Sequence, residues 1–209
     1  GKTPFFNKRS PTPVDEPASL VWLLENTFSH AISAIQSKLE EEFDIDYTND
    51  HQILELGFWP GGDRDGNPNV TTETTTAVAS LLRQIIFRCY YRDFRVLKRR
   101  ITFRGIEKTI SRLEKLLYQN AFNVQPQPKN LQGELLLLLN SIKETLITDH
   151  GGLFVDIVDG MIQKVRLFGC FFATVDIRQD SRVLRNVYKY CTQQTQIKTG
   201  IPEKYETLK

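Results

Sequence analysis

Apolar residues recur at spacings of three and four residues in six stretches of the chain, which is the pattern of amphipathic helices. The first stripe runs from Leu20 to Leu39, a span of about five helical turns. Thr72 is expected to cap the second helix, with Glu73 in its first turn and an inner face that continues to about Leu97. The remaining helices are expected over residues 106–117, 131–147, 154–165 and 181–191.

Two short apolar runs interrupt this helical pattern. Residues 53–59 and 170–178 are rich in aromatic and β-branched side chains, which is typical of strands. Two isolated strands do not form a stable sheet by themselves. The sequence therefore predicts a mainly α fold of six helices with two short strands. Either the strands pair inside a helical shell, or they belong to a (β/α) barrel of which this chain is an incomplete piece.

The chain is long enough for one domain, since its 209 residues fall near the usual domain size. Prolines and a lack of periodicity predict that residues 1–13 form an extended arm. Residues 14–191 are expected to form a single, mostly helical unit, and residues 192–209 a polar tail.

Composition excludes several classes of protein. With 40% hydrophobic and 25% charged residues the chain is globular rather than disordered. A net charge of +2 disfavours nucleic acid or an acidic membrane as the main partner. No apolar run approaches the length of about 18 residues that a membrane span needs. Three scattered cysteines without a Cys-x-x-Cys pair indicate neither a zinc site nor a disulfide framework, so the cytoplasm is the expected compartment.

One stretch of the chain is locally basic. It is interpreted either as a solvated helix face or as a contact for an anionic effector or nucleic acid. Its members are Arg92, Arg95, Lys98, Arg99, Arg100 and Arg104.

Residues 61–71 are the most unusual segment, with the sequence Gly-Gly-Asp-Arg-Asp-Gly-Asn-Pro-Asn-Val-Thr. They follow the first predicted strand directly and precede a helix, and ligands of α/β proteins bind at such carboxyl ends of strands. The glycines permit close approach of the backbone to a ligand. Arg64 can bind a carboxylate or a phosphate through two hydrogen bonds, and Asp63 or Asp65 can orient it.

Other interpretations of this segment differ in what they require. A calcium loop would use Asp63, Asp65 and Asn67 as its first ligands. It would then require a glycine where Pro68 stands and an acidic ligand where Thr74 stands. A phosphate-binding P-loop requires a Gly-Lys-Ser/Thr ending that is absent here. A purely structural turn, held by an internal ion pair, remains an open alternative.

The second predicted strand also ends in charged residues. Strand alternation places Asp176 and Arg178 on one face. An arginine at the end of a buried strand is costly unless it is paired or faces a ligand. Arg178 is therefore a candidate anion-binding residue, held by Asp176 or Asp180. The alternative is an ion pair that closes the start of the following helix.

Three segments carry a resemblance to a known family. They are Pro-Thr-Pro-Val-Asp-Glu at 11–16, Phe-Trp-Pro at 58–60 together with the segment 61–71, and Val-Asp-Ile-Arg-Gln-Asp-Ser at 175–181. From about Pro11 to Tyr190 the chain resembles phosphoenolpyruvate carboxylase. The resemblance implies a much longer, mainly helical protein with an embedded (β/α) barrel, of which the two strands here are two staves.

The resemblance also implies an activity. The family converts phosphoenolpyruvate and bicarbonate to oxaloacetate and phosphate with Mg²⁺ or Mn²⁺, which supplies the tricarboxylic acid cycle. Its members are cytoplasmic homo-oligomers, typically tetramers. Arg178 matches an arginine that contacts the substrate phosphate, and Arg64 is expected to make a second anion contact or to act as a positioning residue. The residues expected to support this site are Gly61, Gly62, Asp63, Asp65, Gly66, Asn67 and Asp176.

The chain also departs from the family pattern. The catalytic histidine of the family lies in a Thr-Ala-His-Pro-Thr-Glu segment, which is absent here. The catalytic lysine and the acidic metal ligands are also absent, and no histidine follows Gln179 closely. We therefore expect an internal fragment of a divergent member, inactive alone and partnered by the remainder of its polypeptide. The alternative is a non-catalytic helical domain that binds an anionic effector or another protein.

Overall fold

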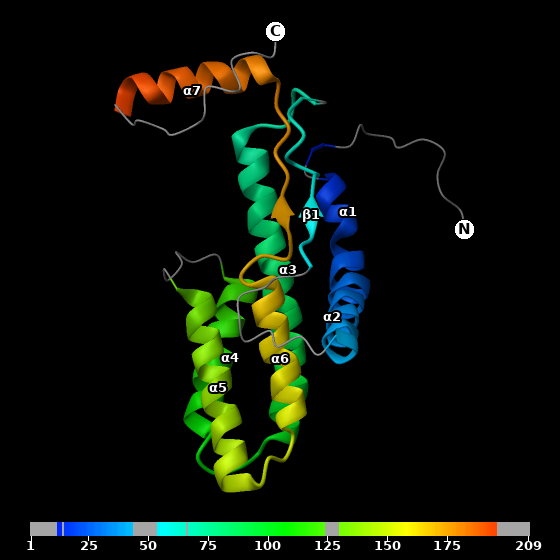
Figure 1. Ribbon diagram of the computed structural model, residues 1–209, viewed down its shortest axis with the longest axis vertical. Coiled ribbons are helices and arrows are strands. Elements are labelled where there is room, and N and C mark those ends of the chain that lie inside the picture. The colour runs from blue at the N-terminus through cyan, green and yellow to red at the C-terminus, as the bar shows by residue number, and fades with distance from the viewer. Residues whose placement is uncertain (1–11, 14, 44–53, 66, 124–129, 196–209) are drawn as a thin grey trace, which may run out of the picture.

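A computed structural model describes residues 12–13, 15–43, 54–65, 67–123 and 130–195 (Figure 1). Most of the predicted N-terminal arm (residues 1–11) and most of the predicted tail (residues 196–209) lie outside these described residues. Helices dominate the described part, and the mainly α prediction is confirmed. None of its helices is both long and apolar enough to cross a lipid bilayer.

The first predicted helix is a continuous helical rod with a π-helical turn in its middle. It consists of α1 (Asp15–Leu23), the π turn η1 (Leu24–Phe28) and α2 (Ser29–Phe43). Within the π turn the carbonyl oxygen of Glu25 accepts a hydrogen bond from the hydroxyl of Ser29 at 2.7 Å and another from Nη2 of Arg92 at 3.1 Å. The π turn leaves the carbonyl oxygen of Glu25 available to Arg92, and this hydrogen bond connects the rod to the helix that carries Arg92.

The central helix is α3 (Thr72–Arg100), which packs against α1, η1, α4 (Glu107–Phe122) and α6 (Val155–Phe168). Its cap is Thr71 rather than the expected Thr72. The Thr71 oxygen accepts from the amide of Thr74 at 3.4 Å, so the helix begins one residue past its cap. The buried inner face of α3 consists of Val78, Leu82, Ile85, Ile86, Phe87, Cys89, Tyr90, Phe94 and Leu97.

The other two helices are α5 (Leu131–His150), which packs against α4 and α6, and α7 (Ser181–Thr195). Figure 1 shows α3 to α6 running side by side, with α7 projecting from one end. Helix α7 continues four residues past the predicted end at residue 191. Residues 181–191 of α7 are all exposed.

The two strands pair with each other in parallel. They are β1 (Gly57–Phe58) and β2 (Thr174–Val175), with Gly57 opposite Thr174 and Phe58 opposite Val175. Both are much shorter than predicted. The segment before β2 joins the helical core instead of extending the strand, since the amide of Phe172 donates to the carbonyl oxygen of Leu82 on α3.

A buried tyrosine ties the core to the approach to β2. The hydroxyl of Tyr90, from α3, lies 3.1 Å from the carbonyl oxygen of Lys164 and 2.9 Å from that of Gly169. Gly169 ends α6 with a positive φ of 57°. Burial raises the pKa of Tyr90 well above its ordinary value, so the hydroxyl remains a donor to these carbonyl oxygens.

Candidate anion-binding site

The carboxyl ends of β1 and β2 are joined by main-chain hydrogen bonds beyond the strands themselves. The amide of Asp176 donates to the carbonyl oxygen of Phe58 at 2.9 Å. Further on, the amide of Arg178 donates to the carbonyl oxygen of Gly62, and the amide of Arg64 donates to the carbonyl oxygen of Arg178, both at 3.0 Å. The two predicted segments therefore lie together, with both arginines on one connected strip of backbone.

Two glycines make this close approach possible. A Cβ atom on Gly62 would lie 2.0 Å from the carbonyl oxygen of Asp176, which is main chain and has little room to shift. Gly61 has a φ of 80°, and a Cβ atom there would lie 2.4 Å from Cγ2 of Val78. Both positions therefore need glycine, the first for space and the second for backbone conformation as well.

The side chain of Arg178 reaches Asp63 in the segment that begins with Gly61 and Gly62, which is called the glycine loop below. Its Nη1 atom lies 3.8 Å from Oδ2 of Asp63, and its side chain is 66% exposed. The ion-pair partner that the structure gives Arg178 is thus Asp63, rather than the expected Asp176 or Asp180. Asp63 and Arg178 also face each other across an isolated parallel bridge, and this pairing of distant segments could not be inferred from local spacing.

Arg64 is directed to the start of α3. Its Nη2 atom donates to the hydroxyl of Thr75 at 3.1 Å, and that hydroxyl donates to the carbonyl oxygen of Gly61 at 2.8 Å. The partner of Arg64 is therefore Thr75, rather than the expected Asp63 or Asp65. Its Nε atom is buried and has no hydrogen-bond partner among the described residues. Asp65 is exposed.

Thr75 was missed by the sequence analysis. The signal for it was weak, because one threonine among the five at residues 71–76 carries no distinctive spacing. A hydrogen bond from the Thr71 side chain is the largest cause of the lowered pKa of Glu73, and the charge of Arg64 is a smaller cause in the same direction. The first turn of α3 thus holds the loop arginine in place.

The remaining predicted loop residues have structural contacts where they are described. Oδ1 of Asn67 accepts from the amide of Asn69 at 2.9 Å, which is an Asx turn. Asp176 lies against Gly57, where an added Cβ atom would be 2.6 Å from Oδ2 of Asp176. Gly66 lies outside the described residues.

Asp180 caps α7 and pairs with Arg182. Oδ1 of Asp180 accepts from the amide of Arg182 at 2.7 Å, and both carboxylate oxygens face its guanidinium. Hydrogen bonds from Arg182 lower the pKa of Asp180 to about 2. The ion pair that closes the helix start therefore exists, as the alternative interpretation held, but it involves Arg182 and leaves Arg178 outside it.

The locally basic stretch does not form one uniform surface. Arg92 turns toward the rod, where its Nη2 atom also lies 3.2 Å from Nε2 of His30. Lys98 pairs with Glu114 at 2.6 Å. The exposed members are Arg95, Lys98, Arg99, Arg100 and Arg104.

The structure is thus a mainly helical protein with one short parallel strand pair, and an arginine follows each strand. A sequence model of phosphoenolpyruvate carboxylase matches residues 2–128 and 104–209. The chain therefore belongs to the phosphoenolpyruvate carboxylase family, and the resemblance stated above is confirmed.

Curated relatives agree with this assignment. Phosphoenolpyruvate carboxylase of Photorhabdus laumondii is 26% identical, and those of Yersinia pseudotuberculosis and Yersinia pestis are each 28% identical. Each alignment covers 84% of this chain and 24% of the relative. The chain thus spans about a quarter of the length of the curated relatives that it matches.

Gly62→Ala should disrupt the contact between the two strand ends. Because the new methyl group would overlap the carbonyl oxygen of Asp176, we expect the free energy of unfolding to fall by about 2 kcal/mol or more. Gly160→Ala on α6 is the control, since nothing lies within 4 Å of its added Cβ atom. Urea denaturation measures both, and equal effects of the two substitutions would contradict the close approach at Gly62.

Arg182→Ala should return the pKa of Asp180 toward its ordinary value of 3.8. Because the folded pKa is depressed, the cap of α7 is stabilised above about pH 4 and weakens as the pH falls toward 2. Carboxyl-carbon NMR of Asp180 across this range measures the shift. The control is Arg185→Ala on the same helix, and an unchanged titration in Arg182→Ala would refute the side-chain pair of Asp180 and Arg182.

Proposed function

We propose that this chain forms the phosphate-binding part of the active site of a phosphoenolpyruvate carboxylase, with Arg178 binding the substrate phosphate. Family membership supports the reaction, in which phosphoenolpyruvate and bicarbonate give oxaloacetate and inorganic phosphate. The observation that carries the proposal is the main-chain contact of Arg178 with the glycine loop at the ends of two parallel strands.

Arg178 is suited to an anion because its backbone is fixed while its side chain stays accessible. The separation of 3.8 Å from Asp63 is too long for a hydrogen bond, so this contact orients the guanidinium by charge alone. A guanidinium presents its donors in a planar fork that matches two oxygens of a phosphate. The donors of Arg178 therefore suit a phosphate that arrives from solvent.

Arg64 has a different role in this proposal. Its contact with Thr75, and through that hydroxyl with Gly61, holds the loop against the start of α3. Its buried Nε atom is a donor without a partner among the described residues, and such a group destabilises the loop unless an acceptor approaches. Arg64 is thus a positioning residue whose main-chain amide also contacts the carbonyl oxygen of Arg178.

The other groups of the reaction are proposed to come from residues outside this sequence. Within the described part of the chain, no three His, Cys, Asp or Glu side chains gather to hold a metal ion. The Mg²⁺ or Mn²⁺ that the family uses therefore has no fitting site in this part. We infer that a longer polypeptide supplies the metal ligands, the histidine and the lysine, and that it assembles as a homo-oligomer.

Arg178→Ala should weaken the binding of phosphoenolpyruvate to the 209-residue chain by about tenfold or more, because a charged hydrogen-bonding pair is lost. Isothermal titration calorimetry measures the affinity. Arg182→Ala is the matched control, since that arginine is also exposed but pairs with Asp180, and it should bind as the unaltered chain does. Equal affinities of the Arg178→Ala variant and the unaltered chain would contradict the proposed role.

The 209-residue chain alone should form no oxaloacetate from phosphoenolpyruvate, bicarbonate and Mg²⁺. The reason is that it lacks the Thr-Ala-His-Pro-Thr-Glu segment and a described metal site. Reduction of any oxaloacetate by malate dehydrogenase, followed as loss of NADH absorbance, measures this. Oxaloacetate formation that Arg178→Ala abolishes would show that the chain is catalytically complete.

A further inference from the structure

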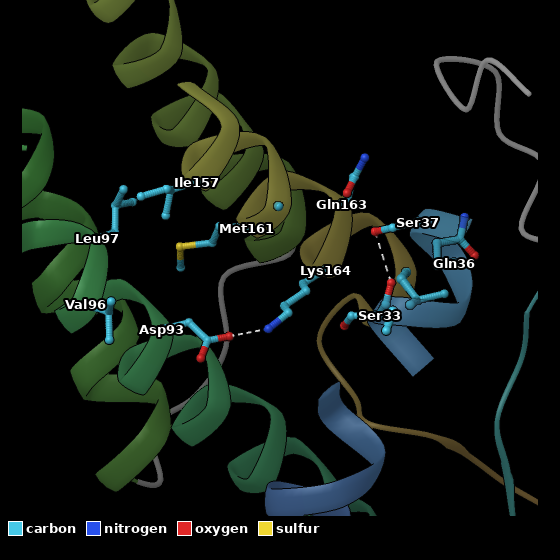
Figure 2. Close-up of a pocket in the computed structure, with 13 residues that line it drawn as sticks. Ser33, Gln36, Ser37, Asp93, Val96, Leu97, Ile157, Met161, Gln163 and Lys164 are labelled. Carbon is cyan, nitrogen blue, oxygen red and sulfur yellow. Dashed lines mark hydrogen bonds and ion pairs between the residues drawn. The ribbon is translucent and has the colours of Figure 1, made fainter. Parts of the chain in front are cut away.

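Helices α2, α3 and α6 surround a cavity of about 400 Å³ that is separate from the strand ends (Figure 2). Asp93, in its wall, lies about 30 Å along α3 from Thr72, where that helix leaves the glycine loop. The volume falls in the range of small-molecule sites. The cavity therefore offers a second binding place, which does not depend on the proposed phosphate site.

The ion pairs beside the cavity leave one positive charge uncompensated. Nζ of Lys164 lies 2.6 Å from Oδ2 of Asp93, and Nε of Arg92 lies 3.6 Å from Oδ1 of the same carboxylate. Arg92 also donates to the carbonyl oxygen of Glu25, whose carboxylate pairs with Arg88. In this group three cations face two carboxylates, so a ligand with a single negative charge balances it.

Lys164 is the cation that faces the cavity. Among the described residues that line the cavity, only Lys164 and Asp93 are charged. Arg92 instead turns toward the rod, where its Nη2 atom lies 3.4 Å from Oγ of Ser29. An ammonium group has three donors, of which the carboxylate of Asp93 takes one. The excess positive charge and further donors are therefore available to a ligand at Lys164.

A carboxylate can contact Lys164 on the side away from Asp93. Figure 2 shows Lys164 between Asp93 on one side and Ser33 and Ser37 of α2 on the other. The hydroxyl of Ser33 donates to the carbonyl oxygen of Ser29 at 2.8 Å, and that of Ser37 donates to the carbonyl oxygen of Ser33 at 3.1 Å. Because helix carbonyl oxygens also accept main-chain amides, these bonds are optional, and each hydroxyl can rotate to donate to another acceptor. The cavity thus offers donors from α2 and α6 to one carboxylate.

Another part of the cavity wall is apolar. Figure 2 shows Val96 of α3 facing Ile157 and Met161 of α6. Met161 stands three residues before Lys164 on the same helix, so the two side chains are neighbours on its surface. Gly160 adds open space, since nothing lies within 4 Å of a Cβ atom added there. An aliphatic chain placed here leaves water for an apolar environment, which favours binding.

We propose that this cavity binds a small monocarboxylate with a short aliphatic chain. The carboxylate accepts hydrogen bonds from Lys164 and from the serine hydroxyls, on the side of the ammonium group away from Asp93. The chain runs along α6 past Met161 and packs against Val96. The single negative charge of the ligand balances the excess positive charge of the ion-pair group. This site is independent of the phosphate site at Arg178.

Met161 provides a direct probe, because it is the single methionine of the sequence. The 209-residue chain with a ¹³C-labelled methionine methyl group is titrated with 4-methylpentanoate, and the methyl signal should shift and saturate. 4-Methylpentanamide has the same shape without the charge, and acetate has the charge without the chain. Each should bind about tenfold more weakly or worse. Equal binding of either analogue, or no shift with 4-methylpentanoate, would overturn the proposal.

Variants test the charge and the location separately. Lys164→Met should abolish the saturable shift, whereas Lys143→Met should retain it, since Lys143 forms an equivalent pair with Asp159 outside this cavity. Gly160→Leu should fill the cavity from an open helix position without affecting folding, and Gly160→Ala, which adds one methyl group, is its matched control and should still bind.

The outcomes distinguish this site from the proposed phosphate site. Binding of 4-methylpentanoate that survives Gly160→Leu would refute the location even if Lys164→Met fails to fold. Arg178→Ala should leave this titration unchanged, because the strand ends lie elsewhere on the molecule. A weaker methyl shift in that variant would contradict the independence of the two sites.

Discussion

The main-chain hydrogen bonds between residues 62–64 and Arg178 determine the geometry of the candidate site. They bring together segments more than a hundred residues apart in sequence, and they do so without relying on any side chain. Side-chain pairs on an exposed surface contribute little to stability, as the long contact between Asp63 and Arg178 illustrates. The backbone contact therefore fixes the main-chain positions from which the two arginine side chains extend. The ion pair only adjusts the orientation of the Arg178 guanidinium.

Helix α3 connects the parts of the molecule that have been assigned roles. Its first turn holds Arg64 through Thr75, its middle anchors the approach to β2 through Tyr90, and its later turns line the cavity through Asp93. The buried apolar face along this helix makes it one continuous support. Helix α3 thus supports both the strand ends and the cavity, although these two regions do not contact each other.

The helices and their order could be predicted from sequence, because a periodic apolar stripe is a local property. The π turn at residues 24–28 could not, since it depends on Arg92 reaching Glu25 from another helix. The strands were predicted too long because an apolar run looks alike in a strand and in a core segment, and Phe172 belongs to the core. Likewise, a glycine-rich loop and two arginines were recognisable, whereas the partners Asp63 and Thr75 depended on tertiary packing.

The close approach of Gly62 to the backbone of residue 176 has a consequence for how this region can vary between related proteins. Exchange of most exposed side chains leaves the strip of backbone intact, so point changes are tolerated outside the glycines. Insertion or deletion of one residue between Phe58 and Arg64 would shift the register and turn alternate side chains to the opposite face. The number of residues in this segment should therefore vary less between related proteins than the identity of its exposed side chains.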